Sequence, residues 1–275
     1  GPWCHGCWQE PLENTLGPWS LGHDTAREFR EQVEAPFFAY WLHGKGARPD
    51  WRATTFQTGS NRWRRYDAWP PKEAAPTSLY LHADGSLGFE APAAADKGTK
   101  RSYVSDPANP VPYRPRPISP TYPDGDWVRW ESGDQRFVDH RPDVLSFTSA
   151  PLTHDLTVTG EVSAELFAST SGTDSDFVVK LIDVFPEDAD KVDWYVNADA
   201  TGPAPGEYAR KMNGYQLPIA MEVRRGRYLR SYEHPHPLEP NVPLRWPVPL
   251  RDRDHVFLKG HRIMVQVQST WFPLI

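Results

Sequence analysis

The residues with the clearest potential for chemistry stand at the start of the chain, in the segment Gly-Pro-Trp-Cys-His-Gly-Cys-Trp that spans residues 1–8. This segment places His5 between Pro2 and Gly6, two residue types that favour a tight turn. An imidazole titrates near neutral pH, so it can take a proton from a nucleophile and return it to a leaving group. His5 is therefore a candidate general base. A structural histidine in an aromatic loop is the alternative that the motif leaves open.

Two cysteines, Cys4 and Cys7, flank His5 with C-x-x-C spacing, which also occurs in redox and zinc sites. A structural zinc site needs four ligands, and no second C-x-x-C or H-x-x-x-H pair follows at a usual spacing. A redox pair is expected at the start of a helix after a strand, whereas here Pro2 and His5 crowd the turn. We therefore expect free or adventitiously paired thiols, with no metal and no cofactor.

Two other groups could hold a metal ion. His234 and His236 are separated by one proline, and no carboxylate–histidine set lies near them in the sequence, so an exposed loop is the better interpretation. Asp174 and Asp176 lack the glycine and the terminal glutamate of a calcium loop, so we expect them to form turns.

Aromatic residues suggest two kinds of binding surface. The run Arg62–Tyr66 interleaves arginines with aromatics, as some anion-binding surfaces do, but the acidic chain favours arginine–tryptophan packing at a domain junction. Trp127 and Trp130 lie in the proline-rich stretch 90–150 and could stack on sugars. We expect this stretch to pack over a neighbouring domain instead.

A helix is predicted between Gly22 and Gly46. Asp24 or Thr25 can cap its start, Pro36 should kink or restart it, and Gly44 can end it. Its aromatic residues recur at helical spacing, which predicts that they are buried against a sheet. The aromatic residues and valine of this stripe are Phe29, Val33, Phe37, Tyr40 and Trp41.

The remainder of the chain is rich in strand patterns. Apolar residues alternate over 156–168 with a bend or bulge expected at Gly160, and again over 217–223, where Pro218 indicates an edge strand or a bulge. The stretch 177–185 is apolar on both faces, as in a central strand. A hairpin is expected around Asp84-Gly85 and a last strand over 262–268, whereas 187–214 and 231–254 are interpreted as polar insertions.

Composition limits the classes of partner. The 275-residue chain has a formal net charge of -6, which argues against a surface that reads phosphates, so we expect no nucleic-acid partner. It has no run of about twenty apolar residues, so no membrane span and no membrane partner are expected. Proline (29 residues) and tryptophan (12 residues) are abundant, which suits strands joined by ordered loops.

Residues 1–6 resemble the Gly-Pro-Trp-x-His-(Gly/Ser) segment of the serine hydrolases that include cocaine esterases, X-Pro dipeptidyl-peptidases and α-amino acid ester hydrolases, and the last of these, the β-lactam antibiotic acylases, are the most similar. Further segments that carry the resemblance are residues 37–40, 58–63, 68–71, 134–139, 141–145, 169–176 and 260–269. The resemblance implies a mainly β chain: the C-terminal end of an α/β-hydrolase domain over residues 1–50, followed by a jelly-roll β-sandwich over residues 51–275.

The resemblance also implies that His5 is the histidine of a catalytic triad. In α/β-hydrolases the triad follows the order serine, acid, histidine, and no Gly-x-Ser-x-Gly occurs in the chain. We therefore expect the C-terminal part of a longer enzyme, whose serine and aspartate precede Gly1. That enzyme would act on a small α-amino acyl ester or amide through an acyl-enzyme, could form a homo-oligomer, and would be periplasmic or secreted. The alternatives are an X-Pro dipeptidyl-peptidase or a general carboxylesterase, and, in another class, a non-catalytic β-sandwich that binds glycans.

Overall fold

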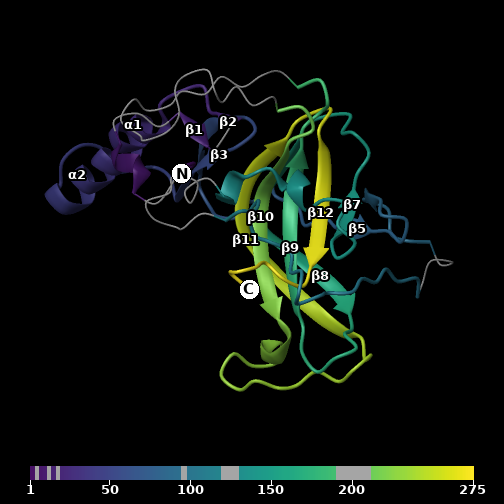
Figure 1. Cartoon of the computed structure of the whole chain (residues 1–275). Helices are drawn as coiled ribbons and strands as arrows, with labels where there is room; N and C mark the ends of the chain where they lie inside the picture. The colour runs from purple at the N-terminus through teal and green to yellow at the C-terminus, as the bar shows by residue number, and fades with distance from the viewer. Residues whose placement is uncertain (4–5, 11–13, 17–18, 94–97, 119–129, 190–211) are drawn as a thin grey trace.

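The computed structural model describes residues 1–3, 6–10, 14–16, 19–93, 98–118, 130–189 and 212–275. The N-terminal third carries the α-helices and several short strands, and the long strands lie in the rest of the described chain, where loops and short 3-10 turns join them (Figure 1). The mainly β class expected from the sequence is confirmed.

Two layers of antiparallel strands form a β-sandwich. One is a four-stranded sheet in the order β10-β9-β12-β7, and the other is the long pair β11-β8 (Figure 1). Strands of the sandwich are β7 (Leu145–Thr148), β8 (Leu156–Ala168), β9 (Asp176–Val184), β10 (Gln216–Arg225), β11 (Leu244–Phe257) and β12 (Arg262–Gln268). Apolar side chains fill the space between the layers, and Phe177 of β9 meets Trp246 of β11 edge-on at 4.7 Å. Burying such side chains contributes about 1.5–3 kcal/mol each.

Most of the predicted strands are present. β9 lies between β10 and β12 and is buried along nearly its whole length, as its sequence predicted. β10 is an edge strand with a register shift between Pro218 and Ala220, which confirms the interpretation of its proline. Of the bend or bulge expected at Gly160, the bulge is absent, because Gly160 pairs with Arg253 without a register shift. Gly160 has φ 100°, and a Cβ there would lie 2.8 Å from the Cβ of Pro70, so close packing requires the glycine.

The polar insertion expected at 231–254 is also wrong in its second half, because β11 begins at Leu244. Its side chains alternate: Trp246, Val248 and Leu250 are buried, whereas Pro247 and Pro249 are exposed. Proline is tolerated here because β11 is at the edge of its layer, where an N–H need not pair with a second strand. The sequence analysis missed this alternating pattern because Pro247 and Pro249 are typical of loops.

A helix covers residues 25–43 in three parts: α1 (Thr25–Phe29), a π-helical segment η2 (Arg30–Glu34) and α2 (Ala35–His43). Asp24 caps its start by accepting a hydrogen bond from the Arg27 N–H, and Gly44 ends it in the left-handed conformation, as predicted. Pro36 cannot donate to the Gln32 carbonyl, and its ring would clash with that carbonyl in a regular α-helix. The wider π turn accommodates the ring, and Gln32 accepts from Arg65 at 3.3 Å instead.

The expected burial of the aromatic stripe is wrong for α2. Of the stripe residues in α2, Phe37 and Trp41 are exposed by 38% and 53%, and Tyr40 is half-buried. Helical periodicity identifies a common face, but it does not identify what covers that face. With the segment after α2, this face lines an open groove of about 540 Å³ that includes Trp51.

The shorter elements connect these two parts. The hairpin β3 (Ala53–Gln57) and β4 (Arg62–Tyr66) lies beside β11, and β5 (Tyr80–Leu81) and β6 (Leu87–Gly88) form the hairpin predicted around Asp84-Gly85. The remaining strands and 3-10 turns are β1 (Thr15–Leu16), β2 (Trp19–Ser20), η1 (Cys7–Gln9), η5 (Gln135–Phe137) and η6 (Gly226–Tyr228).

The described part of the proline-rich stretch packs on the sandwich itself. Tyr113 and Trp130 form an edge-on aromatic cluster with Trp271, next to Val178 of β9. Trp130 is thus partly covered by other rings, and Trp127 lies outside the described residues. Below this layer, the Nζ of buried Lys180 donates to Gln135 at 2.8 Å, and burial lowers the pKa of this lysine to about 7. β9, expected to be apolar on both faces, therefore carries a buried amine.

Candidate functional site

His5 and Cys4 lie outside the described residues, but the segments on both sides of them are described. Gly6 adopts φ 82° at the start of η1, a left-handed conformation that glycine takes without strain. Cys7 is disulfide-bonded. Of the two states expected for the thiols, free or paired, the structure therefore shows the paired one for Cys7. The candidate site is therefore the segment around residue 5, bounded by Trp3 before it and η1 after it.

An aromatic cluster holds the segment before residue 5. The ring of Trp3 lies 5.2 Å from Phe29 of α1 and 5.9 Å from Trp63 of β4. Trp63 also contacts Phe56 of β3 at 5.4 Å, and its indole N–H donates to the Glu28 carboxylate at 3.1 Å. Offset and edge-on aromatic pairs contribute about 0.5–1.5 kcal/mol beyond their buried area. The β3–β4 hairpin thus supports the N-terminal turn through Trp63.

Arg30 holds the segment after residue 5. Its Nη1 donates to the carbonyl oxygens of Trp8 and Glu10, the latter at 2.8 Å. Both carbonyls belong to η1 or to the residue that follows it, and η1 is closed by the Glu10 N–H donating to Cys7 at 3.0 Å. A guanidinium that binds two carbonyls fixes the turn against the helix.

His23 was not singled out by the sequence, yet it joins the helix start to the hairpin. Its Nδ1 lies 2.7 Å from the Glu28 carboxylate, and its Nε2 lies 2.9 Å from the Asn61 carbonyl. Burial lowers the pKa of His23, but the hydrogen bond to Asn61 and the interactions with Glu28 outweigh it, so the pKa is raised above its ordinary value. Two acceptors around one imidazole favour the protonated ring.

A second histidine set is buried between the layers. Thr58 Oγ1 lies 2.8 Å from His255 Nδ1, His255 Nε2 lies 3.3 Å from Asp183, and His261 Nδ1 lies 2.8 Å from the other oxygen of Asp183. Burial raises the pKa of Asp183, but the two histidines outweigh it, so the pKa is lowered. A hydroxyl, an imidazole and a carboxylate stand here in the order of a triad. However, two imidazoles share the carboxylate, and the side chains of His255 and Asp183 are buried away from any substrate. We therefore interpret the arrangement as structural: it binds β9, β11 and the residue before β12 to the turn that carries Thr58.

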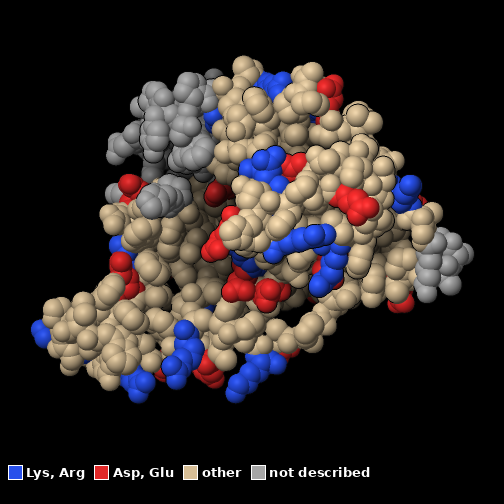
Figure 2. Space-filling model, turned by 90° about the horizontal axis from the view of Figure 1, so that it is seen from below, with Lys and Arg blue, Asp and Glu red and all other residues tan. Residues whose placement is uncertain are grey.

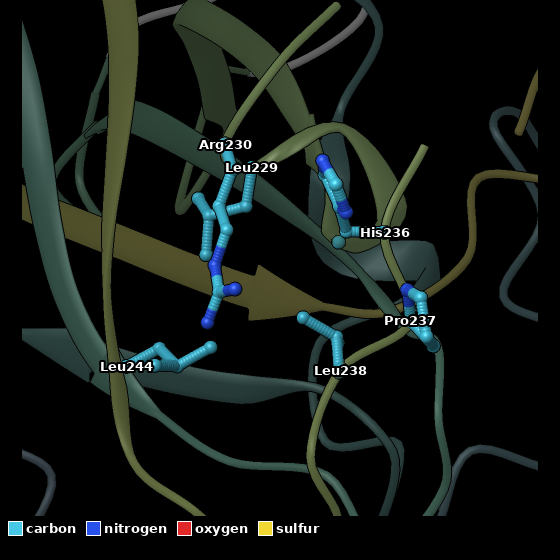
Figure 3. Close-up of a pocket in the computed structure, with 7 residues that line it drawn as sticks. Leu229, Arg230, His236, Pro237, Leu238 and Leu244 are labelled. Atoms are coloured by element: carbon cyan, nitrogen blue, oxygen red, sulfur yellow. The ribbon is translucent and has the colours of Figure 1, made fainter. Parts of the chain in front are cut away.

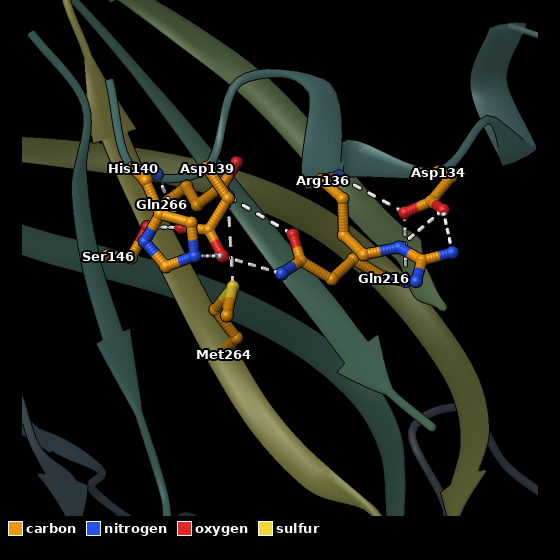
Figure 4. Close-up of polar contacts among 8 residues, drawn as sticks. All are labelled: Asp134, Arg136, Asp139, His140, Ser146, Gln216, Met264 and Gln266. Atoms are coloured by element: carbon orange, nitrogen blue, oxygen red, sulfur yellow. Dashed lines mark hydrogen bonds and ion pairs between the residues drawn. The ribbon is translucent and has the colours of Figure 1, made fainter. Parts of the chain in front are cut away.

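The segment 134–146 contains serine, aspartate and histidine side chains in a different order (Figure 4). Asp139 accepts from Ser146 Oγ and from Gln216 Nε2, both at 2.7 Å, and His140 Nε2 lies 3.7 Å from it. Because the carboxylate stands between the hydroxyl and the imidazole, the imidazole cannot take the proton of Ser146. This network fastens the loop to β7 and β10, and it carries no nucleophile.

The other candidates from the sequence take structural places. His234 and His236 are exposed, as expected, and His236 stands beside a small pocket in which the Arg230 guanidinium lies between Leu238 and Leu244 (Figure 3). Within the described ranges, no group of three or more His, Cys, Asp or Glu side chains could hold a metal ion.

Asp174 and Asp176 are arginine partners. Their carboxylates bind Arg227 and Arg225, and they also accept from the backbone N–H groups of Arg227 and Gly226 at the start of η6. The expectation that they form turns in their own segment is wrong, because Asp176 begins β9 and both carboxylates instead bind the start of η6 on another segment.

The arginine–tryptophan packing predicted for Arg62–Tyr66 is not seen among the described cation–π pairs. Trp63 packs on aromatic rings instead, and Arg62, Arg64 and Arg65 are exposed. On the face drawn in Figure 2, basic and acidic side chains are interspersed. Among the helices of the described chain, none is long and apolar enough to cross a membrane.

Comparison with known proteins identifies the family of the chain. Residues 43–275 match the X-Pro dipeptidyl-peptidase C-terminal non-catalytic domain. The chain belongs to this family. The matched range covers the described sandwich and the β3–β4 hairpin, and it excludes residue 5.

Relatives of this family member are longer hydrolases. The cocaine esterase of Rhodococcus sp. (strain MB1 Bresler) is 32% identical over 94% of this chain and 43% of its own length. A putative serine esterase of Mycobacterium bovis is 32% identical over 68% of this chain and 28% of its own length. The chain thus spans less than half the length of the curated relatives that it matches. The superfamily resemblance expected from the sequence is confirmed.

Two solved structures are similar over the whole chain. One is titled an aminopeptidase from a marine sediment archaeon, Thaumarchaeota archaeon, and the other an α-amino acid ester hydrolase. Each superposes with a TM-score of 0.85 at 43% identity, covering 100% of this chain and 42% of the other. A CocE/NonD family hydrolase from Staphylococcus aureus, 14% identical with a TM-score of 0.53 over 91% of this chain and 40% of its own, shares the fold.

Proposed function

We propose that the chain is the C-terminal part of a serine hydrolase that hydrolyses or transfers the acyl group of α-amino acid esters and amides, including β-lactam antibiotics. The observation that carries the proposal is the 43% identity, over the whole chain, to a structure titled an α-amino acid ester hydrolase. In this proposal residues 1–50 end an α/β-hydrolase domain, and residues 51–275 form the sandwich that follows it.

His5 is the proposed general base and acid. In acylation, its imidazole takes the proton of the serine hydroxyl as the oxygen attacks the acyl carbon, and it then gives that proton to the leaving alcohol or amine. In deacylation, it takes a proton from water or from an acceptor amine, and it returns the proton to the serine oxygen. The serine, the acid and the oxyanion donors would come from the part of the enzyme that precedes this chain.

A peptidase is the second candidate. The archaeal structure, with the same identity and TM-score, is titled an aminopeptidase. An esterase without a requirement for an α-amino group is the third, and the relatives named as esterases support it. A non-catalytic glycan-binding sandwich is the alternative of another class. Of the two tryptophans considered for it, Trp130 packs against Tyr113 and Trp271, and Trp127 lies outside the described residues.

The test uses the full-length hydrolase that contains this chain. Wild-type enzyme is assayed on phenylglycine methyl ester, on an X-Pro p-nitroanilide, on an aminoacyl p-nitroanilide and on p-nitrophenyl acetate. The proposal expects the highest kcat/KM on the phenylglycine ester, and a preference for either anilide would favour the peptidase. His5→Ala should lower kcat about 10³ to 10⁶-fold with little change in KM, because triad members act as a unit. The exposed His234→Ala is the matched control, and a His5→Ala enzyme that keeps a tenth of its kcat would contradict the role of His5.

A further inference from the structure

A lysine side chain lies in the middle of a covered sheet face. Lys180 is on β9, between β10 and β12, and it is 0% exposed. Val179 and Leu181 on either side of it belong to the apolar core, so Lys180 points to the opposite face of the four-stranded sheet. The described segments that cover this face include η5 and the aromatic cluster around Trp271. The amine is therefore separated from water by protein.

The surroundings of this amine suit its neutral form. Its Nζ donates to Gln135 Oε1 at 2.8 Å, and the Gln135 amide nitrogen donates to the Gly133 carbonyl at 2.7 Å, which fixes the direction of Oε1. The side-chain carbonyl oxygens of Gln266 and Gln268 are buried on the same face, but neither has a hydrogen-bond partner among the described residues. An ammonium has three N–H groups, so two of them would lack an acceptor here.

Within the described chain, no carboxylate balances a charge on Lys180. At the ends of this sheet face, Asp176 binds Arg225 at 3.0 Å, and Arg262 donates to the Ser149 carbonyl. The charged and titratable side chains of the described covering segments are Tyr113, Arg114, Arg116, Glu131, Asp134, Arg136, Asp139, His140, Arg141 and Asp143. None of them forms an ion pair with Lys180, and burial is the cause of its lowered pKa.

The bond to Lys180 is the buried attachment of η5 itself. Before η5, the Tyr215 hydroxyl donates to the Ser132 carbonyl at 2.8 Å, and after η5 Val138 is buried in an apolar cluster. Within the three residues of η5, Gln135 is the buried one. The Gln135 carbonyl also accepts from the Val138 N–H at 3.1 Å. A local opening at Gln135 would therefore release this amide while the flanks stay attached.

We propose that Lys180 makes the attachment of η5 to the four-stranded sheet sensitive to pH: the neutral amine keeps the contact closed, and protonation favours a locally open state in which water reaches Nζ. The inference does not depend on the proposed function. It assigns a conformational role to a buried group that the proposed chemistry does not use.

The sign of the pH dependence follows from burial. Burial lowers the pKa of Lys180 from 10.5 to about 7 in the closed state, whereas water restores the ordinary value in the open state. The closed state therefore binds fewer protons than the open state between these two values. Its stability rises with pH from about 7 to about 10.5, and below about pH 7 it stays at its lowest level.

The first test measures hydrogen exchange by mass spectrometry at pH 6 and pH 8, in peptides that cover residues 134–144 of the full-length protein. After correction for the intrinsic exchange rate at each pH, the opening constant of wild type should be about tenfold larger at pH 6 than at pH 8. Lys180→Met should show the same opening constant at both values to within about twofold. Lys259→Met is the matched control, because Lys259 is exposed, and it should keep the wild-type ratio.

The exposed His140 lies in the same peptides and also titrates, but it is present in all three proteins. Its contribution is therefore common to them, and the comparison isolates Lys180. A tenfold ratio that persists in Lys180→Met, or a wild-type ratio within about twofold of one, would overturn the proposal.

A second variant supplies the missing counter-charge. Gln135→Glu keeps the shape of the side chain and places a carboxylate next to Nζ, which favours the ammonium in the closed state. The opening constant should then no longer be larger at pH 6 than at pH 8.

NMR of protein labelled with ¹³C at the lysine Cε follows the amine directly. The resonance that is missing in Lys180→Met should titrate near pH 7 in wild type and above about pH 9 in Gln135→Glu. A wild-type midpoint above about pH 9 would overturn the proposal, whatever the exchange data show.

Discussion

The interior of the sandwich and the seam at its end are held together by different forces. We use the term seam for the contact of β3 and the turn after it (residues 53–61) with residues 254–256 of β11. On the face of β9 that points between the layers, Phe177, Val179 and Leu181 belong to the apolar core, and the next residue of that face is Asp183. The change from apolar to charged side chains occurs where the N-terminal third joins the sandwich.

Polar hubs close the seam. Asp254 accepts from Thr55, Gln57, Tyr66 and Thr159, and His255 joins Thr58 to Asp183. An apolar interface tolerates small shifts because its attraction is non-directional, whereas hydrogen-bonded carboxylates require one geometry. Both regions therefore stabilise the fold, but only the seam does so through directional and partly charged hydrogen bonds, which also fix the orientation of the hairpin that carries Trp63. The following variants test this division of roles.

Asp183→Ala should have the largest effect, a loss of about 3–5 kcal/mol in the free energy of unfolding, measured by urea denaturation. Removing one partner of a buried charge cluster leaves His255 and His261 without an acceptor. Glu161→Ala on β8, which is exposed, should change stability by less than about 0.5 kcal/mol.

The same site predicts a pH dependence. The pKa of Asp183 is lowered in the folded state, so its stabilisation is present above the unfolded pKa and is lost as pH falls through the folded pKa. Asp183→Asn should therefore flatten the loss of stability below about pH 4, whereas Phe257→Ala, a core variant, should lower stability by a similar amount at every pH. Parallel pH curves for Asp183→Asn and wild type would mean that the seam does not depend on this charge.

Gly59→Ala should lower the free energy of unfolding by about 2–4 kcal/mol, because an alanine is strained in the left-handed conformation and its Cβ would overpack the site. Gly59 has φ 88°, and a Cβ there would lie 2.0 Å from the Val256 carbonyl oxygen. The substitution forces the turn away from β11, where the Val256 N–H donates to Thr58 at 2.8 Å. Gly98→Ala is the control, since its φ is also positive and nothing lies within 4 Å. Equal losses in thermal unfolding would show that backbone strain, and not close approach, requires Gly59.

Asp254→Asn should lower the free energy of unfolding by about 1–3 kcal/mol, because the amide keeps the shape of the side chain but weakens the charge-assisted hydrogen bonds from four donors. The neighbouring and exposed Asp252→Asn removes a charge from the same strand, and it should cost less. Chemical denaturation of both variants at one pH provides the comparison. If Asp252→Asn costs as much as Asp254→Asn, the hub at Asp254 is not what closes the seam.

The smallest effect is expected at His23, whose side chain is 33% exposed, so the loss in His23→Gln should stay below about 1 kcal/mol. Its pKa is raised in the folded state, so the contribution is fully present below the unfolded pKa of about 6.5 and is lost as pH rises through the folded value. Thermal unfolding should therefore separate His23→Gln from wild type at pH 5.5 and not at pH 9. The sign is opposite to that at Asp183, and a larger difference at pH 9 would contradict the pairing with Glu28.

The sequence by itself determined the local elements. Alternation over 156–168 and 262–268 predicted β8 and β12, and Asp24 and Gly44 predicted the ends of the helix, because period and capping depend on residues a few positions apart. The same local information failed for β11, where Pro247 and Pro249 resemble a loop until the edge position of the strand is known. It also could not show that Phe37 and Trp41 of α2 lie exposed.

Only the tertiary structure decided which polar residues meet. The carboxylate of Asp183 reaches His261 across 78 positions of sequence, and that of Asp254 reaches Gln57 across 197. The Arg30 guanidinium reaches the Trp8 carbonyl across 22 positions. Such contacts depend on strand order and on the packing of layers, which no local period encodes. The sequence named His5 through the chemistry of its imidazole. The contacts on either side of it came from the fold, because Trp3 packs on rings of the helix and of the β3–β4 hairpin, and η1 is bound by Arg30 of the helix.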